Sequence, residues 1–242
     1  MNTNKNYEEV YLYPIERGGK FGFKDEVGRL VIPCQWIFAW PFFEGLAAVI
    51  DDNGKWGYID KTGKVVISCK WKSSSFFSEG LAAVQDENKK WGYVDISGNV
   101  VIPCLWNEVG PFKENLASVA DRAWKWGYID KTGQVVILCQ WKHADEFYNG
   151  YARVQDFNDK WGIINKMGRE VCPCLWKSVI SFSNGMAMVQ DFNDKWGYID
   201  ETGNLTIPCQ WKDAQCFFDC LAKVQDDYGY WHKIDKTGNV VE

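Results

Sequence analysis

The stretch KWGYIDKTG, residues 55–63, joins a Trp–Gly pair to a β-branched and aromatic run and an Asp-x-x-Gly turn. Close copies are KWGYVDISG (90–98), KWGYIDKTG (125–133), KWGIINKMG (160–168) and KWGYIDETG (195–203). The Trp recurs every 35 residues, and one step further back falls on Phe21 in KFGFKDEVG (20–28). The copies, centred on residues 21, 56, 91, 126, 161, 196 and 231, predict a single repeat domain over residues 1–242.

Other positions follow the same period. The first Trp column is Trp56, Trp91, Trp126, Trp161, Trp196 and Trp231, and we expect it to be the structural core of the repeat. A second Trp column is Trp36, Trp71, Trp106, Trp141, Trp176 and Trp211. Each of these Trp residues stands two positions after a member of a Cys column, which consists of Cys34, Cys69, Cys104, Cys139, Cys174 and Cys209. The block QDFNDKWG occurs unchanged at 155–162 and 190–197, which indicates duplication.

Each copy predicts a three-stranded antiparallel meander. Residues 45–51 (GLAAVID), 55–60 (KWGYID) and 64–67 (KVVI) have strand composition, and turn residues separate them. Gly63 closes the second turn, where a positive φ is needed. Residues 33–45 (PCQWIFAWPFFEG) form a longer connection, which we expect to pack as a lid over the meander.

Both faces of such a sheet are apolar, because side chains alternate along a strand. Trp56 and Tyr58 take one face, and Gly57 and Ile59 take the other. A sheet that is apolar on both faces must be covered on both, and the natural cover is the next copy. We therefore expect Gly57 and Ala47 to make room for an indole of the neighbouring copy.

The predicted fold class is all-β. It is a tandem array of seven 35-residue three-stranded antiparallel meanders in an open, solenoid-like superhelix, with a closed seven-bladed β-propeller as the alternative. The net charge is −5 and the basic residues are scattered, which disfavours nucleic-acid binding. No window approaches the roughly 18 apolar residues of a membrane span. Without a visible signal peptide, we expect a cytoplasmic protein.

These motifs resemble the bacterial WG-repeat family, whose unit contains G-L-A-x-V, K-W-G-Y-I-D-x-x-G and V-V-I-P segments, over essentially the whole chain. A weaker likeness links the hairpin to choline-binding repeats of cell-wall proteins. The WG resemblance implies a repeat scaffold without general catalytic activity. Departures are Phe21 for Trp, His232 for Gly, and Ile163, Asn165 and Cys172 in the fifth copy.

The second Trp column is the candidate ligand site. We place it in the connection, where an exposed aromatic stripe could stack sugars or bind a quaternary ammonium group. Lys72, Lys142, Lys177 and Lys212 follow it directly. The alternative is that these indoles pack over the edge of the meander.

The Cys column has a zinc or redox interpretation and a packing one. Structural zinc needs closely spaced ligand sets, whereas each copy supplies one Cys. The local pairs are Cys172/Cys174 and Cys216/Cys220. We favour buried apolar fillers at the end of the third strand over zinc sites or a disulfide ladder, and we expect no metal and no cofactor.

Five acid–lysine pairs flank the first turn, and we expect them to serve turn chemistry and solubility: Asp51/Lys55, Asp86/Lys90, Asp121/Lys125, Asp156/Lys160 and Asp191/Lys195. No nucleophile, phosphate-loop or zinc-protease motif occurs. The irregular pieces 121–126 (DRAWKW) and 216–220 (CFFDC) are further candidate local sites.

The sequence predicts a non-catalytic scaffold that binds a protein partner. The alternatives are a binder of cell-wall glycan or choline-like ligands along the second Trp column, and a self-assembling structural protein. No nucleic acid is expected as a partner.

Overall fold

The computed structural model describes residues 11–241, and every regular element in that range is a β-strand. The strands form seven antiparallel sheets of three or four strands. This confirms an all-β tandem array. Each sheet contains the meander strands of one copy, and strands that follow one another in the chain lie side by side in the sheet. With no helix in the described residues, none of them could cross a membrane as a helix. Whether the array is an open superhelix or a ring stays a prediction.

The first strands of the copies are β1 (Tyr13–Arg17), β5 (Leu46–Ile50), β9 (Leu81–Gln85), β13 (Leu116–Ala120), β17 (Tyr151–Gln155), β21 (Met186–Gln190) and β25 (Leu221–Gln225). The second strands are β2 (Lys20–Lys24), β6 (Trp56–Asp60), β10 (Trp91–Asp95), β14 (Trp126–Asp130), β18 (Trp161–Asn165), β22 (Trp196–Asp200) and β26 (Trp231–Asp235). The third strands are β3 (Leu30–Trp36), β7 (Val65–Trp71), β11 (Val100–Trp106), β15 (Val135–Trp141), β19 (Glu170–Trp176) and β23 (Leu205–Trp211).

The predicted connection contains structure of its own. Its start continues the third strand as far as the second-column Trp, so β7 ends at Trp71. Its middle forms a further strand, which pairs with the first strand of the next copy, as Phe38–Ala39 does with Ile50 and Val49. These strands are β4 (Phe38–Ala39), β8 (Ser73–Ser74), β12 (Glu108–Val109), β16 (His143–Ala144), β20 (Ser178–Ser183) and β24 (Asp213–Ala214).

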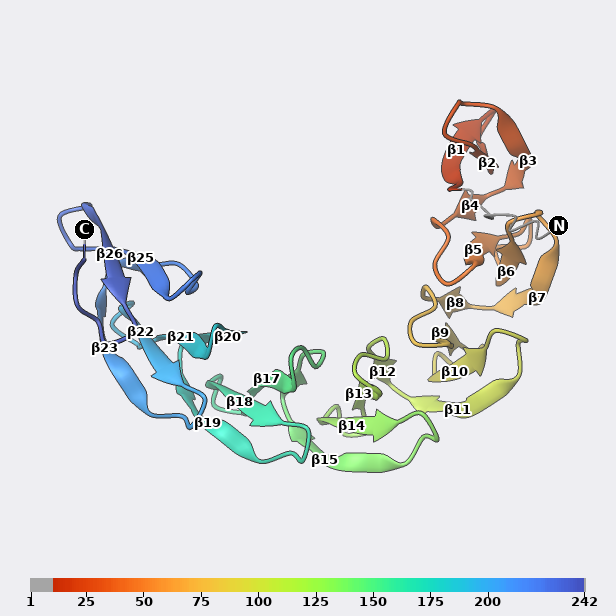
Figure 1. Ribbon diagram of the computed structural model, residues 1–242. Helices are drawn as coiled ribbons and strands as arrows, with labels where there is room; N and C mark the ends of the chain where they lie inside the picture. Colours follow the sequence, from red (N-terminus) through yellow and green to blue (C-terminus); the bar gives the residue numbers. More distant parts are fainter. Residues whose placement is uncertain (1–10, 242) are drawn as a thin grey trace, which may run out of the picture. The chain divides into compact units, whose positions relative to one another are not determined.

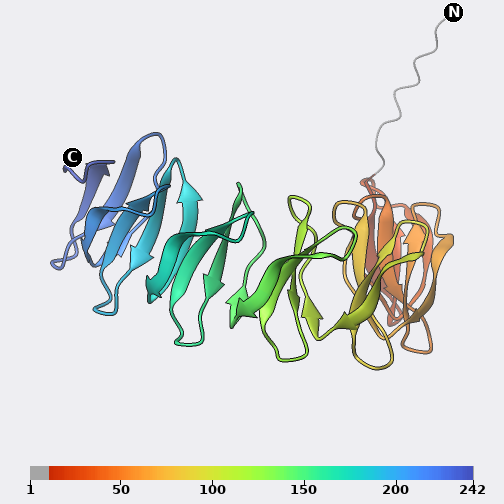
Figure 2. The ribbon, with the colours of Figure 1, turned by 90° about the horizontal axis from the view of Figure 1, so that it is seen from below.

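The chain divides into two compact units, Met1–Pro111 and Phe112–Glu242. The first contains the sheets β1–β3, β4–β7 and β8–β11, and the second contains β13–β15, β16–β19, β20–β23 and β24–β26. Within each unit the sheets follow one another in sequence order, each facing the next (Figures 1 and 2). The expectation of a single domain stays a prediction.

The hydrophobic cores lie between successive sheets. One cluster joins Ala48, Tyr58 and Trp71 of the second copy to Ala82, Val84 and Val94 of the third. We call the side of each sheet with the residues equivalent to Ala48 and Tyr58 its tyrosine face, and the side equivalent to Ala47, Val49 and Ile59 its isoleucine face. Every core resolved within a unit packs a tyrosine face against the isoleucine face of the next copy. The prediction that neighbours cover both faces is confirmed for these cores.

The connection contributes to these cores, as expected of a lid. Phe77 lies with its ring centroid 4.9 Å from that of Tyr58, and Phe147 lies 4.8 Å from Tyr128 in the same way. The tyrosine hydroxyl then donates a hydrogen bond to a carbonyl oxygen of the same connection, 2.8 Å from Tyr58 to Ser75 and 2.6 Å from Tyr128 to Asp145. The connections after the second, third, fourth and sixth sheets are each fixed in this way to the sheet before them.

The expected role of the WG pair is wrong in one respect. The backbone of Trp56 lies opposite Trp71 of its own sheet, and its partly buried ring packs against the core that also contains Ala82 of the next copy, so the error concerns the glycine. A Cβ atom on Gly57 would lie 2.5 Å from the carbonyl oxygen of Ile67 and 2.7 Å from the backbone nitrogen of Cys69. The glycine thus makes room for the third strand of its own copy, where the ladder is irregular. The buried indole in this core is Trp71.

Candidate functional site

The turn between the first and second strands has the same frame in the second to seventh copies. In the second copy the Asp51 carboxylate accepts hydrogen bonds from the backbone N–H groups of Asn53 (3.0 Å) and Lys55 (2.9 Å). Gly54 then takes a left-handed φ of 73° and donates its N–H to the Asp51 carbonyl oxygen. The N–H of Lys55 lowers the pKa of Asp51, so the carboxylate stays charged at neutral pH.

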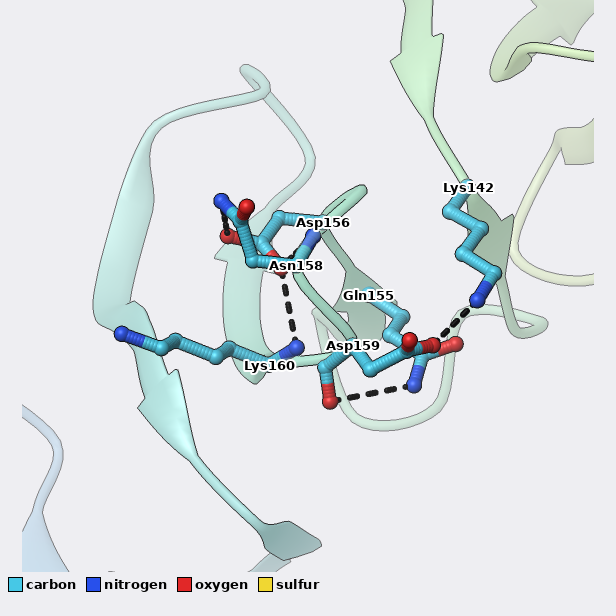
Figure 3. A network of polar contacts seen from close by, with 6 residues as sticks. All are labelled: Lys142, Gln155, Asp156, Asn158, Asp159 and Lys160. Atoms are coloured by element: carbon cyan, nitrogen blue, oxygen red, sulfur yellow. Dashed lines mark hydrogen bonds and ion pairs between the residues drawn. The ribbon is translucent and has the colours of Figure 1, made fainter.

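Figure 3 shows this frame in the fifth copy. Asp156 accepts from the backbone N–H groups of Asn158 (2.9 Å) and Lys160 (2.8 Å), and the side-chain amide of Gln155 donates to the carbonyl oxygen of Asp159. Partial burial raises the pKa of Asp156, but these N–H donors outweigh burial and leave it lowered. Asp159 also forms an ion pair with Lys142. The turn is therefore held in place independently of its outermost residue, Phe157.

The five predicted acid–lysine pairs take part in this frame, which confirms their role in the turn. The contact in each pair runs through the backbone N–H of the lysine, at 2.8–3.0 Å from the carboxylate. Two of the lysine ammonium groups bind in the next copy: Lys55 forms an ion pair with Glu87, and Lys195 forms one with Asp227. Both partners lie in the same turn of the next copy, so successive turns lie side by side within a unit.

The outermost residues of these turns differ between the two units. In the first unit they are polar, with Asp52 and Glu87 bound to lysines of the preceding copy. In the second unit every turn exposes an aromatic ring. We call these residues the aromatic turn row: Trp124 (58% exposed), Phe157 (57%), Phe192 (59%), Tyr228 (89%) and Tyr230 (69%).

Trp124 has an unusual backbone for a bulky residue. Its φ of 60° lies in the left-handed region, at the position that Gly54 occupies in the second copy and Asp159 in the fifth. A bulky residue such as Trp is disfavoured in this region. The chain therefore keeps an exposed indole at a conformational cost. The irregular piece 121–126 is part of this row.

We expected the second Trp column to lie in a loop-like connection. Each member instead forms the last residue of a third strand. Each Trp lies opposite the first-column Trp of its copy, or opposite Phe21 in the first copy. Trp36, Trp71 and Trp141 are buried, and Trp106, Trp176 and Trp211 are half-buried. The predicted ligand-binding role of this column stays a prediction, and the burial places its rings within or beside the cores.

The Cys column lies within the third strands, and all nine thiols are free. Burial raises the pKa of Cys69 to about 11 and that of Cys174 to about 12. The Cys174 thiol lies 3.8 Å from the carbonyl oxygen of Val154, to which it can donate. Within the described residues no group of three or more His, Cys, Asp or Glu side chains could hold a metal ion. The other local pair, Cys216 and Cys220, is exposed.

One polar cluster was not predicted from the sequence. In the fifth copy Arg153 lies opposite Ile163, where the second copy has Ala48 opposite Tyr58. Arg153 donates to the Asp145 carboxylate at 2.6 Å and to the Val179 carbonyl oxygen at 3.0 Å. Its guanidinium thus replaces the missing tyrosine hydroxyl as the donor to the connection. The signal was present as two coordinated departures in one copy, Arg for Ala and Ile for Tyr.

His143 belongs to the same cluster. Its ring lies 5.7 Å from the rings of both Trp126 and Trp161, and Nε2 lies 2.9 Å from an Asp145 oxygen. A cavity of about 490 Å³ lies beside it, lined by Asp145, Glu146, Arg153, Ile180 and Ser181. Because Arg153 and Asp145 satisfy each other, we assign the cluster to packing.

One comparison with known proteins identifies the repeat. The sequence model described as "WG containing repeat" matches residues 21–56, 56–90, 91–120, 126–161, 161–196 and 196–231. No curated protein matches the chain in sequence.

Similar solved structures include KlHsv2 with loop 6CD replaced by a Gly-Ser linker. It is 9% identical with a TM-score of 0.49, over 96% of this chain and 94% of that one. The computationally designed Ika8 protein is 11% identical with a TM-score of 0.45, over 96% and 86%. BamB from Moraxella catarrhalis is 10% identical with a TM-score of 0.42, over 95% and 86%. We draw no functional conclusion from these likenesses.

Proposed function

The chain belongs to the WG-containing repeat family, and from this premise we propose that it is a non-catalytic scaffold that binds a protein through the aromatic turn row. The observation that carries the proposal is that four successive turns of one unit each expose an aromatic ring on a turn held by its own hydrogen bonds.

The chemistry of these side chains suits protein recognition. Tyr, Trp and Phe are enriched at protein interfaces, because they bury a large area and lose few rotamers on binding. The turn frame adds rigidity, since Asp156 and Asp191 fix the backbone on either side of Phe157 and Phe192. Little further ordering would be needed when a partner binds.

The spacing of the row supports an extended interface. The ion pair between Lys195 and Asp227 joins the turn of Phe192 to the turn of Tyr228, so adjacent rings are one sheet apart. A partner that contacts several rings at once would gain from each of them. Single substitutions should then weaken binding, and combined substitutions should abolish it.

The proposal includes the absence of catalysis. Its support is the repetition of the turn carboxylates, each of which accepts backbone N–H groups of its own turn. Carboxylates used in this way are committed to structure in every copy, whereas a catalytic pair would be expected to break the repeat.

Affinity capture with the full chain tests the proposal. Partners are identified by mass spectrometry and compared with those captured by a Phe157→Ser, Phe192→Ser, Tyr228→Ser triple variant. The matched control is Val101→Ser, Leu138→Ser, Leu175→Ser, which removes exposed apolar residues from the third strands. We expect a specific partner to be lost with the turn variant and kept with the control.

Equal capture by the wild type and the turn variant would contradict the proposal. Titration with choline and with cell-wall fragments, followed by Trp fluorescence, tests the alternative that the protein binds a small ligand. Quenching that survives in the turn variant would favour the second Trp column instead.

A further inference from the structure

Two faces meet at each core within a unit, and both are mostly apolar; the charged exception, Arg153 on the fifth sheet, is paired with Asp145. On the isoleucine face the position of Ile59 is fully buried in the second to seventh copies: Ile59, Val94, Ile129, Ile164, Ile199 and Ile234. On the tyrosine face Ala48, Ser118 and Met188 are buried at one position, and Tyr58, Tyr128 and Tyr198 are fully buried at the other. Stacking of one sheet on the next depends on these positions.

The tyrosine face of the seventh sheet is different at both positions. Lys223 replaces the residue equivalent to Ala48, and Lys233 replaces the residue equivalent to Tyr58. The two lysines lie directly opposite each other on β25 and β26. In the described part of the second unit no further sheet packs on this face, and Gln215, Trp231 and His232 complete the lining of an open hollow of about 570 Å³.

His232 stands where the other copies have glycine. In those copies the glycine makes room for the third strand, as at Gly57 and Gly197. On the side of β26 that faces away from β25, the described residues form only an isolated bridge from Ile234 to Val240 in place of a third strand, so a side chain is tolerated. The seventh sheet therefore departs from the stacking pattern at three adjoining positions.

The isoleucine face of the first sheet shows the corresponding change. Lys24 occupies the position of Ile59 and is half-buried. In the described part of the first unit no other sheet packs on that face, because the core of the first sheet lies on its opposite side, around Phe23. The charged substitutions thus fall on the two faces that would meet if one chain stacked on another.

We infer that Lys24 and the Lys223–Lys233 pair prevent end-to-end stacking of this chain on a second copy of itself. Stacking would bring three ammonium groups into a contact that is otherwise apolar and would remove them from water, which is strongly unfavourable. Lysines also protect exposed sheet edges of β-proteins from unwanted association. This inference is independent of the proposed binding through the aromatic turn row.

Two variants restore the apolar faces separately. Lys223→Ala with Lys233→Tyr makes the tyrosine face of the seventh sheet apolar, and Lys24→Ile makes the isoleucine face of the first sheet apolar. Molar mass is measured by gel filtration with light scattering over a hundredfold range of concentration. We expect the wild type to stay at the mass of one chain, 27.9 kDa. An equimolar mixture of the two variants should form a dimer, and the triple variant should form longer chains whose mass rises with concentration.

The control is Lys64→Ala with Lys212→Tyr, which makes the same chemical change at exposed lysines away from both faces. It should remain at the mass of one chain. Circular dichroism and a cooperative melting curve establish that each variant is folded. A triple variant that is folded and stays at the wild-type mass would overturn the inference, as would a wild type that already forms chains.

Discussion

In the second sheet Ala48 lies opposite Tyr58, whereas in the fifth sheet Arg153 lies opposite Ile163. Both pairs fill the tyrosine face of their sheet, and both send one hydrogen-bond donor to the connection that follows. The large and the small residue have exchanged strands. The comparison shows that the core requires a volume and a donor at this place, and that more than one residue pair can supply them.

The largest expected effect is common to both sheets and tests what they share. Gly57→Ala and Gly162→Ala should each destabilise their unit by about 3 kcal/mol, because the new Cβ meets backbone atoms that cannot move aside. Thermal or urea unfolding measures the loss. His232→Ala, at the same position of the seventh sheet, should lower the midpoint far less, because it removes one partly exposed contact with Asp226 and creates no backbone clash. Tolerance of alanine at both glycines would show that the third strands can shift.

Arg153→Ala tests the difference between the fifth sheet and the second. It removes the donor to Val179 and leaves the Asp145 carboxylate without its guanidinium, so we expect a loss of about 2 kcal/mol. Adding Ile163→Tyr to this variant recreates the pair of the second sheet and should recover most of the loss. Unfolding midpoints of the single and double variants provide the check. If the tyrosine gave no recovery, the two pairs would not be equivalent solutions.

Alkaline pH should act on both sheets alike. The raised pKa of the Cys69 and Cys174 thiols means that the folded state favours the neutral form, since burial opposes the thiolate. Their contribution to stability is complete below about pH 9, the usual pKa of the group, and is lost as the pH rises through about 11 for Cys69. Unfolding midpoints between pH 8 and pH 11 measure this loss. A Cys69→Ala, Cys174→Ala variant should show a shallower decline than the wild type.

The smallest effect again distinguishes the copies. Lys55→Met removes an exposed ion pair with Glu87 and should cost less than about 1 kcal/mol, with the difference vanishing in high salt. Lys160→Met in the fifth copy should change nothing measurable, because Phe192 stands where the partner acid would be. A larger loss at Lys160 than at Lys55 would contradict the assignment of the ammonium groups to the next turn.

The sequence predicted the features that repeat with a fixed residue type. The 35-residue interval, the two tight turns and the apolar character of both sheet faces led to the meander and to stacking between copies. The ends of the third strand were not predictable in this way. Trp71 could belong equally to a strand or to a connection, because its composition suits both, and only pairing with Trp56 decides between them.

The role of Gly57 was missed for a related reason. A glycine beside an indole is compatible with a hollow for a neighbour or with close approach of its own sheet's backbone, and the irregular register that selects the second is a property of the folded ladder. For the candidate site the aromatic residues were visible, but their exposure was not. Trp124 was noticed only as a break in the pattern, since a side chain's burial depends on which turn position it occupies.

The two-sided sheet has a consequence for how the protein comes apart. The sixth sheet contributes Ile199 to the core before it and Tyr198 to the core after it, so its loss would expose both at once. Among the described residues, the seventh sheet contributes to one core. Unfolding of the second unit should therefore begin at its last sheet and proceed sheet by sheet toward the first. Amide hydrogen exchange would record this as a gradient of protection along the chain.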